Sequence, residues 1–393
     1  MRRVSKAVFL IAGLGLMAGA SAAQQCGGPF SGFVEDMKQA AIARGHDPAT
    51  VARFFASVRQ DPAVIKADHR QGFFQKPFTE FARRLISRNR LDTARAKARK
   101  YAPLFARIEA RFGVSRGMLL ALWAFETDFG GFQGDFNTLN ALMTLAHDCR
   151  RPQIFRPQVM AALTLFERGD FDPVRTTGAW AGEIGMVQML PGDILKNGVD
   201  GDGDGHVRLK SSAPDALMSG GKLLQSLGWR AHEPWLQEVS VPRGLDWAQA
   251  GLTTRKPGAE WARLGVRPRQ GKIAAGLPAS LILPQGRFGP AFLAYPNFTV
   301  LFQWNKSFTY VLTAAYFATR LEGAPAFDPG HPEPGLSGPQ MQALQRKLAA
   351  HGHDVGKIDG ILGAGTRAAV RAMQMKLGMP ADGWPTPALL DRL

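Results

Sequence analysis

The chain has 393 residues, of which 45% are hydrophobic and 20% charged, a composition that excludes disorder, collagen and coiled coil. This length is enough for two or three domains with well-filled cores. Lysine and arginine number 48 against 32 acidic residues, and the resulting formal charge of +16 favours a polyanionic partner or surface.

Residues 1–23 have the pattern of a secretory signal peptide. Basic residues at positions 2, 3 and 6 precede an apolar core over residues 7–17, and small residues at 20–23 end the segment. The core is too short to span a membrane, and no later stretch has the roughly 20 apolar residues of a transmembrane segment. We therefore expect a soluble protein, exported to the periplasm with its signal peptide cleaved. Because an exported chain rarely meets nucleic acid, an envelope or wall polymer fits the basic charge better.

The chain has two cysteines, Cys26 and Cys149. Two are too few for a disulfide scaffold or for a cysteine-rich zinc site. An oxidising compartment favours a single bridge between them, and two unpaired thiols are the alternative.

The spacing of apolar residues divides the chain into four parts. Residues 30–230 have apolar residues three and four apart, which predicts helices. Between residues 239 and 298, short apolar runs separated by glycine and proline predict a small sheet or hairpin subdomain. Helical spacing resumes over 304–321, and the proline-rich stretch 323–336 predicts a linker. Residues 337–393 predict three short helices, the last beginning at Thr386-Pro387.

Glu126 stands near the end of a helix that begins after Ser115 and is apolar on every side. It shares one helix face with Leu119, Leu122 and Trp123. Desolvation in such a stripe raises the pKa of a carboxyl, as a general acid near neutral pH requires. The alternative is a structural glutamate that bonds to backbone or to a basic side chain.

The string ALWAFETDFG, which contains Glu126, resembles the catalytic helix of the lytic murein transglycosylases of the transglycosylase B family. Further segments follow in the family's order: AHDCRRP, GAWAGEIGMVQMLPGD, the acidic loop VDGDGDGHVRL, AYPNF and WNKSFTYVLTAAYFATRL. These matches extend over roughly residues 30–321. The resemblance implies a mainly α (α+β) fold, with a lysozyme-like helical catalytic domain over 28–322 that carries the small β subdomain.

The resemblance also implies an activity on peptidoglycan glycan strands. Enzymes of the family cleave the β-1,4 bond between N-acetylmuramic acid and N-acetylglucosamine and leave a 1,6-anhydromuramyl end. Glu126 would first protonate the glycosidic oxygen and then, as a carboxylate, take the proton from the C6 hydroxyl, while the substrate's N-acetyl group stabilises the cationic centre. Ordinary glycosidases use two carboxylates, and no second one is obvious in this sequence.

The family's motifs further imply a set of substrate-binding residues. Arg150 and Arg151 would face the peptide part of the substrate, although a solvated arginine pair is the alternative. Gln188 would line the groove near Glu126, although a backbone hydrogen bond within its turn is the alternative. The late segments add further groove residues: Tyr295, Asn297, Asn305, Ser307 and Tyr310.

Two positions depart from the family's pattern. Ala179 stands where a serine usually helps to orient the catalytic carboxyl, and Glu183 stands where a small residue is common. If Glu183 points into the groove, it would serve as a second carboxylate that activates water, and the protein would be a hydrolytic muramidase. If Glu183 faces solvent, it is a turn residue. A catalytically idle peptidoglycan-binding protein is a further alternative.

The acidic loop has the first half of a calcium-binding pattern. Asp200, Asp202 and Asp204 occupy positions one, three and five, and the backbone carbonyl of His206 occupies position seven. A serine stands at position twelve, where an EF-hand has its glutamate. The resemblance implies closure by a later aspartate, for which Asp215 is the candidate. We expect a structural calcium ion here, no cofactor for the chemistry, and a solvated turn as the alternative.

Residues 337–393 resemble the three-helix peptidoglycan-binding domain type 1. The landmarks of the resemblance are Asp359-Gly360, Gly363, Thr366 and Gln374. Glycines and a helix cap at these positions also suit turns, so the landmarks do not identify a binding surface. The resemblance implies a weak binder that raises the local concentration of the polymer for the catalytic domain.

Overall fold

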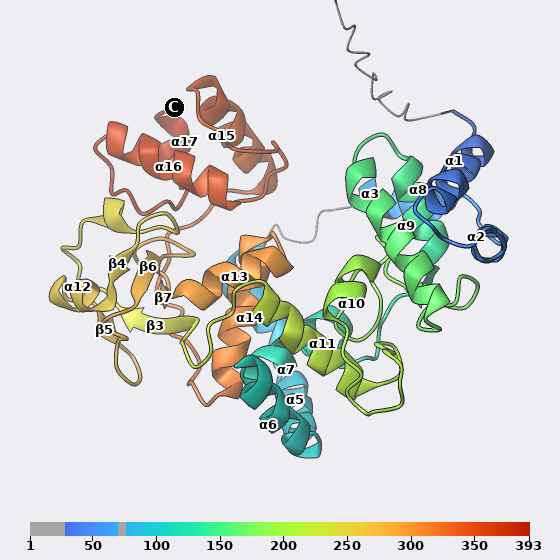
Figure 1. Ribbon diagram of the computed structural model, residues 1–393. Coiled ribbons are helices and arrows are strands. Elements are labelled where there is room, and N and C mark those ends of the chain that lie inside the picture. The colour runs from blue at the N-terminus through green and yellow to red at the C-terminus, as the bar shows by residue number, and fades with distance from the viewer. Residues whose placement is uncertain (1–27, 70–75) are drawn as a thin grey trace, which may run out of the picture.

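The computed structural model describes residues 28–69 and 76–393. Helices form most of the regular structure, and a small five-stranded sheet lies beside α13 (Pro296–Trp304) and α14 (Phe308–Leu321) (Figure 1). This arrangement confirms the mainly α (α+β) prediction. The expected signal peptide over 1–23 and Cys26 lie outside the described residues.

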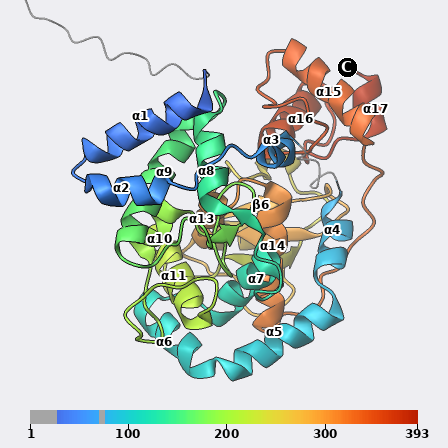
Figure 2. The same cartoon turned by 90° about the vertical axis from the view of Figure 1, so that its right-hand side faces the viewer.

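Two hydrophobic cores hold the helices of the first domain together, and Figures 1 and 2 show how these helices are arranged. The first core lies among six helices: α1 (Phe30–Ile42), α2 (Pro48–Phe55), α3 (Pro62–His69), α8 (Thr138–His147), α9 (Pro152–Glu167) and α10 (Pro191–Asn197). The second core lies among seven: α4 (Phe78–Leu85), α5 (Arg88–Lys100), α6 (Ala102–Phe112), α7 (Arg116–Thr127), α11 (Ala213–Ser226), α13 (Pro296–Trp304) and α14 (Phe308–Leu321). Side chains of α11 belong to both cores, so this helix joins them.

Helix α7 is the centre of the second core and packs along α14. The Ser115 side chain caps α7 by accepting a hydrogen bond from the Met118 amide. Every residue from Gly117 to Ala124 is buried. Because each fully buried Leu or Met side chain stabilises the fold by roughly 1.5–3 kcal/mol, α7 is held rigidly in place. The carboxyl-terminal end of this helix therefore presents Glu126 from a fixed position.

The sheet subdomain has a core of its own around Trp261. Its five antiparallel strands run in the order β4-β6-β7-β3-β5. Their bounds are Leu236–Ser240 for β3, Lys256–Pro257 for β4, Arg267–Pro268 for β5, Pro278–Ile282 for β6 and Ala291–Ala294 for β7. The short helices η1 (Trp247–Gln249) and α12 (Gly258–Arg263) connect them, and a separate strand pair joins β1 (Phe136–Asn137) to β2 (Thr177–Gly178). The predicted small sheet is confirmed.

The C-terminal module consists of α15 (Gly338–Ala350), α16 (Ala364–Lys376) and α17 (Pro387–Asp391). Met341, Leu344 and Leu348, at helical spacing along α15, lie in its core. Thr386 caps the last helix, as its sequence predicts. No helix or strand occupies residues 323–336, the stretch between α14 and this module. The module rests on the sheet subdomain rather than standing apart from it (Figure 1).

Among the described residues, no helix is both long enough and apolar enough to cross a membrane.

Candidate active site

Glu126 accepts hydrogen bonds from two residues that are distant in the sequence. The Trp304 indole Nε1 donates to Glu126 Oε1 over 2.8 Å, and the Tyr310 hydroxyl donates to the same oxygen over 2.5 Å. These three residues are called the Glu126 site below. Phe125, the preceding residue, stacks on Phe317 of α14 with ring centroids 5.3 Å apart. The site is therefore built where α7 ends against α13 and α14.

The surroundings of Glu126 make it a carboxyl that holds its proton. Burial raises its pKa to about 7, although the hydrogen bonds from Tyr310 and Trp304 act in the opposite direction. The nearby charge of Glu183 raises the pKa further. Burial and the neighbouring Glu126 also raise the pKa of Tyr310 well above 10, so its hydroxyl stays a donor. The Glu126 site thus combines an acid near neutral pH with two fixed donors.

The donors are positioned by the connection between α13 and α14. Trp304 is the last residue of α13, and Tyr310 is on the first turn of α14. Ser307 caps α14 by accepting a hydrogen bond from the Tyr310 amide, and Asn305 Oδ1 accepts one from the Ser307 amide over 2.9 Å. The predicted groove residues Asn305 and Ser307 therefore shape the backbone that presents Tyr310, whereas Tyr310 itself contacts Glu126.

A glycine-rich turn over residues 178–189 lies beside the end of α7. The Thr127 hydroxyl donates to the Met186 carbonyl over 2.7 Å and so ties this turn to the helix that carries Glu126. The Ala179 amide donates to the Glu183 carbonyl. A Cβ at Gly178 would overlap that same carbonyl, so only glycine fits at this position.

Glu183 is not a solvent-facing turn residue. Its Oε2 atom is buried and has no hydrogen-bond partner among the described residues. Burial raises the pKa of its carboxyl, while backbone amides and the charge of Arg151 lower it. A second carboxyl, close enough to raise the pKa of Glu126, therefore lies near the end of α7.

Gln188 forms hydrogen bonds to the backbone within its turn, which was the alternative to lining the groove. Its Nε2 donates to the Gly185 carbonyl over 2.8 Å and to the Gln133 carbonyl over 3.3 Å. Its backbone is in the left-handed region at φ 51, which is uncommon outside glycine. The side chain thus holds the turn, and no hydrogen bond joins it to Glu126.

Arg150 and Arg151 share one buried carboxylate. Arg150 Nη2 lies 2.6 Å from Asp68 Oδ2, and Arg151 Nη2 lies 2.5 Å from Asp68 Oδ1. Arg150 also binds Asp148. Both arginine side chains remain about 40% exposed, so each guanidinium keeps a face toward solvent. The pair is neither fully solvated nor fully buried.

Tyr295 and Asn297 correct the predicted set, because both are buried and occupied elsewhere. The Tyr295 hydroxyl donates to Gln237 Oε1 over 2.8 Å inside the sheet subdomain. Asn297 bonds the backbone of Arg230 through both its amide nitrogen and its oxygen. Both side chains are at most 1% exposed. The motif did not show that these side chains are buried. Their hydrogen bonds stabilise the fold.

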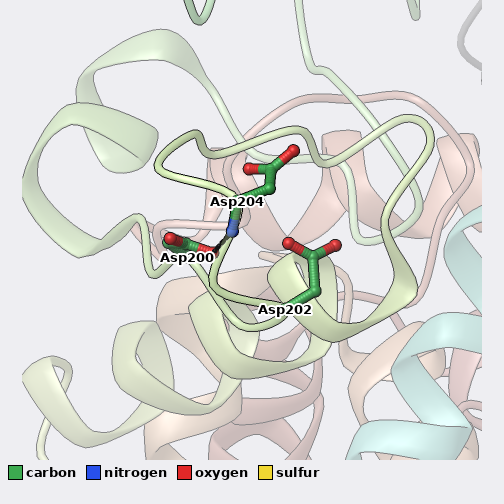
Figure 3. A group of neighbouring side chains, drawn as sticks. All are labelled: Asp200, Asp202 and Asp204. Carbon is green, nitrogen blue, oxygen red and sulfur yellow. Dashed lines mark hydrogen bonds between the residues drawn. The ribbon is translucent and has the colours of Figure 1, made fainter.

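The acidic loop brings three of its carboxylates together. Oxygens of Asp200, Asp202 and Asp204 lie within 4.8 Å of one another, on the loop between α10 and α11 (Figure 3). Asp200 also accepts the amides of Gly203 and Gly205, and these hydrogen bonds hold its pKa below the ordinary value. An ionised, closely spaced oxygen set fits a hard cation.

Asp215 has a different role from the predicted one. Asp215 is 1% exposed, and its two oxygens accept the amides of Gly201 and Arg208. It therefore closes the base of the loop and does not join the carboxylate cluster. The His206 ring lies 3.0 Å from Asp170 Oδ1, and its backbone carbonyl, the predicted ligand, stays a prediction.

Cys149 is disulfide-bonded. Because Cys26 lies outside the described residues, the expected pairing of the two cysteines stays a prediction.

Sequence reasoning missed Trp304 and Asp68 as members of these sites. Trp304 is an aromatic residue of the kind that stacks on sugars, but the sequence does not show that its indole N–H donates a hydrogen bond to Glu126. Asp68 is near the end of α3, far from the arginine pair in the chain, and no local pattern connects them.

The comparison with protein families decides the classification. The sequence profile named "Transglycosylase SLT domain" matches residues 29–319. The chain belongs to this family. A second profile, "Putative peptidoglycan binding domain", matches residues 337–393.

Relatives of this SLT-domain protein include membrane-bound lytic murein transglycosylase B of Escherichia coli (strain K12), which is 26% identical over 51% of this chain and 55% of that protein. Spore cortex-lytic enzyme of Bacillus cereus is 39% identical over 16% of this chain and 25% of its own length. The chain thus spans at most about half the length of the curated relatives it matches.

Among solved structures, SltB3 from Pseudomonas aeruginosa in complex with NAG-anhNAM-pentapeptide is 39% identical with a TM-score of 0.84, over 93% of this chain and 99% of that one. SltB1 from Pseudomonas aeruginosa is 25% identical with a TM-score of 0.64, over 75% and 99%. Escherichia coli Slt35 in complex with calcium is 22% identical with a TM-score of 0.65, over 76% and 96%, and shows the shared fold.

Proposed function

We propose that this SLT-domain protein is an exported lytic transglycosylase of peptidoglycan. It would cleave the β-1,4 bond between N-acetylmuramic acid and N-acetylglucosamine and form 1,6-anhydromuramyl ends. The observation that carries the proposal is the Glu126 site, in which one carboxyl with a pKa raised to about 7 accepts two fixed donors. The SltB3 structure, with NAG-anhNAM-pentapeptide bound, supports the same substrate class.

The arrangement suits one residue that acts first as acid and then as base. Oε1 of Glu126 accepts both hydrogen bonds, so we assign the transferable proton to Oε2. That proton goes to the glycosidic oxygen as the bond to the muramyl C1 breaks. The resulting carboxylate is stabilised by Trp304 and Tyr310 and then removes the proton from the C6 hydroxyl, which closes the anhydro ring. Glu126 ends the cycle protonated.

Glu183 supports the alternative of a hydrolytic muramidase, because its carboxyl is buried close enough to affect Glu126. A base that activates water must be ionised when the bond breaks. Burial raises the pKa of Glu183, which disfavours that state. We therefore do not assign it the role of the water-activating base, and Glu126 is the single acid and base of the proposed reaction. A raised pKa at Glu126 serves proton transfer and has no role in binding alone, so it disfavours the alternative of a non-catalytic wall-binding protein.

The C-terminal module would hold the enzyme on the polymer, as the peptidoglycan-binding profile over 337–393 suggests. Export to the periplasm, with a cleaved signal peptide over 1–23, remains our expectation from the sequence. The basic charge of the chain agrees with a polyanionic wall, and nucleic acid stays outside the expected partners.

We also propose that the acidic loop binds a structural calcium ion. Asp200, Asp202 and Asp204 would hold it through their clustered carboxylates, together with the backbone carbonyl of His206. The ion would supply cross-linking of the loop and no glycosidic chemistry. Asp215 would shape the loop through its backbone hydrogen bonds.

Mass spectrometry of the soluble products released from purified peptidoglycan tests the function. Muropeptides that end in 1,6-anhydromuramic acid are the expected result. Reducing-end muramic acid would instead establish hydrolysis and make Glu183 the first residue to substitute. The absence of any released product would favour the binding protein.

A further inference from the structure

The interface between the C-terminal module and the sheet subdomain gathers three partly buried arginines, Arg287, Arg367 and Arg371. Arg367 of α16 donates to the Pro284 carbonyl over 2.7 Å, and its guanidinium lies 4.8 Å from the centre of the Phe308 ring. Arg371, one turn further along α16, lies against Gly251 of the sheet subdomain and Gly383 of the module. A side chain at Gly251, whose φ is +125, would overlap the Arg371 guanidinium. The two arginines thus stand side by side between the domains.

The charges around this pair do not balance it. Asp382 is the nearby carboxylate, and it is 2% exposed. Its Oδ2 accepts the Arg287 amide over 3.0 Å and Arg287 Nη1 over 3.2 Å. Its Oδ1 accepts Gln374 Nε2 and the Trp384 amide. Glu333 forms an ion pair with Arg287 as well. Three guanidiniums therefore lie near two carboxylates, which leaves an excess of one positive charge. Both oxygens of Asp382 are already engaged, and Glu333 pairs with Arg287 through Oε2.

Arg367 and Arg371 each have one N–H group without a hydrogen-bond acceptor. The Nε–H groups of Arg367 and Arg371 are buried and have no hydrogen-bond partner within residues 28–69 and 76–393. A buried donor without a partner costs about 1–3 kcal/mol, and more when the group is charged. Burial and the charge of Arg371 together lower the pKa of Arg367 to about 9, which agrees with uncompensated like charges in a desolvated place.

The two arginines line a cavity of about 70 Å³ between the domains. Leu252, Ile282 and Phe308 form apolar walls on the side of the first domain. Thr253, Ala364 and Ala368 also line it and are exposed, so the cavity reaches the surface beside small side chains.

We propose that this cavity is a carboxylate-binding site formed jointly by Arg367 and Arg371. A carboxylate is planar and carries two oxygens, which match the fork of donors on a guanidinium. A single negative charge neutralises the excess positive charge, which water in the same space does not do. The size of the cavity suits one carboxylate group, and its opening lets the rest of a larger ligand extend outward.

Two sources supply such a group: a free small carboxylate, or a carboxylate on the stem peptide of peptidoglycan. The assignment of a stem-peptide carboxylate rests on the proposed function, whereas the carboxylate site itself does not. A stem peptide held here would be bound by the module and the first domain together, so the interface would take part in substrate binding.

Titration of the full chain with acetate, followed by the ¹H–¹⁵N signals of the arginine Nε–H groups, tests the site. Acetamide is the matched neutral probe, since it has nearly the same shape. We expect acetate to shift the signals of Arg367 and Arg371 in a saturable manner and acetamide to leave them in place. Unchanged signals with acetate, or equal shifts with acetamide, would overturn the proposal. This outcome needs no variant and hence no assumption about folding.

A pair of variants adds the residue-level test. Arg371→Lys keeps the charge but removes the fork, and we expect it to weaken the apparent acetate affinity about tenfold or more. Arg346→Lys on the exposed face of α15 is the matched control and should retain wild-type affinity. Equal affinities for the two variants would show that Arg371 is not a ligand.

Stem peptide purified from digested sacculi distinguishes the sources. Shifts of the same two signals at lower concentrations than acetate requires would identify the peptide as the ligand. Shifts with acetate alone would retain the carboxylate site and remove its link to peptidoglycan. A failure of the proposed function would appear in the cleavage products, which this titration does not involve.

Discussion

The Glu126 site and the acidic loop both depend on carboxylates, but their surroundings shift the carboxyl pKa in opposite directions. Glu126 lies at the end of a buried helix, where loss of water raises its pKa to about 7. Asp200 lies on an outer loop, where backbone amides lower its pKa. The same functional group is therefore prepared as a proton donor in one place and as an anion in the other.

The two regions also differ in what completes them. Glu126 accepts hydrogen bonds from side chains of α13 and α14, which are distant in the chain. The acidic loop is closed by neighbours, since Asp200 bonds amides only three to five residues away. An acid site thus depends on the packing of the whole domain, whereas an ion-binding loop depends mainly on its own backbone.

The largest effect should come from removing the acid. We expect Glu126→Gln to lower the rate of peptidoglycan cleavage by roughly 10²–10⁴-fold, the usual contribution of general acid-base catalysis, while binding to sacculi persists. Glu183→Gln is the matched control, with a smaller loss and unchanged anhydro products. Product release and sacculus pull-down measure both quantities. A Glu126→Gln variant that digests as fast as wild type would contradict the mechanism.

The second effect is on stability. The folded pKa of Glu126, about 7, lies above the ordinary value of 4.5, so between these pH values the folded chain binds more protons than the unfolded chain. The stabilising contribution of protonated Glu126 to the free energy of unfolding is fully present below pH 4.5 and is lost as the pH rises through 7. We expect wild type to lose on the order of 2–3 kcal/mol more than Glu126→Gln over this window. Denaturant unfolding at pH 4.5 and pH 8 gives the values, and parallel losses in both proteins would refute the assignment.

A third prediction concerns the donors. The hydrogen bond from Tyr310 lowers the pKa of Glu126, so Tyr310→Phe should raise that pKa. Because the acid must be protonated, we expect wild-type activity to decline as the pH rises through about 7. In the variant we expect this decline at higher pH, with a rate about tenfold lower. Tyr316→Phe is the control on the same helix, since its hydroxyl bonds Arg320 and the Phe327 amide. Coincident pH profiles for all three proteins would exclude this role for Tyr310.

The smallest effect should be at the acidic loop. Calcium should raise the Tm by a few degrees, which corresponds to about 1 kcal/mol in a protein of this size. Asp202→Asn should abolish most of that shift, while Asp391→Asn, an exposed acid at the end of α17, should keep it. Thermal unfolding with calcium or with a chelator provides the comparison. If the two conditions give the same Tm for wild type, the calcium proposal fails.

Parts of the site were predictable where the signal lies within one element. The burial of α7 follows from its uninterrupted apolar residues, and the position of Glu126 at its end follows from helical spacing. The clustering of Asp200, Asp202 and Asp204 follows from their alternation with glycine. Tyr295 and Asn297 show the limit of such reasoning, because a motif records which residue is present and not which core its side chain enters.

Local spacing of residues predicted the helices, the position of Glu126 at a helix end, the carboxylate loop and the three-helix module. The lysozyme-like fold class came from the resemblance to the transglycosylase B family. Tertiary structure alone decided that Trp304 and Tyr310, which are 178 and 184 residues from Glu126, donate to it. It also decided that Glu183 is buried near the acid and that Arg367 and Arg371 meet the sheet subdomain. These contacts form only when separate helices pack, since desolvation and hydrogen-bond geometry depend on atoms that local sequence does not specify.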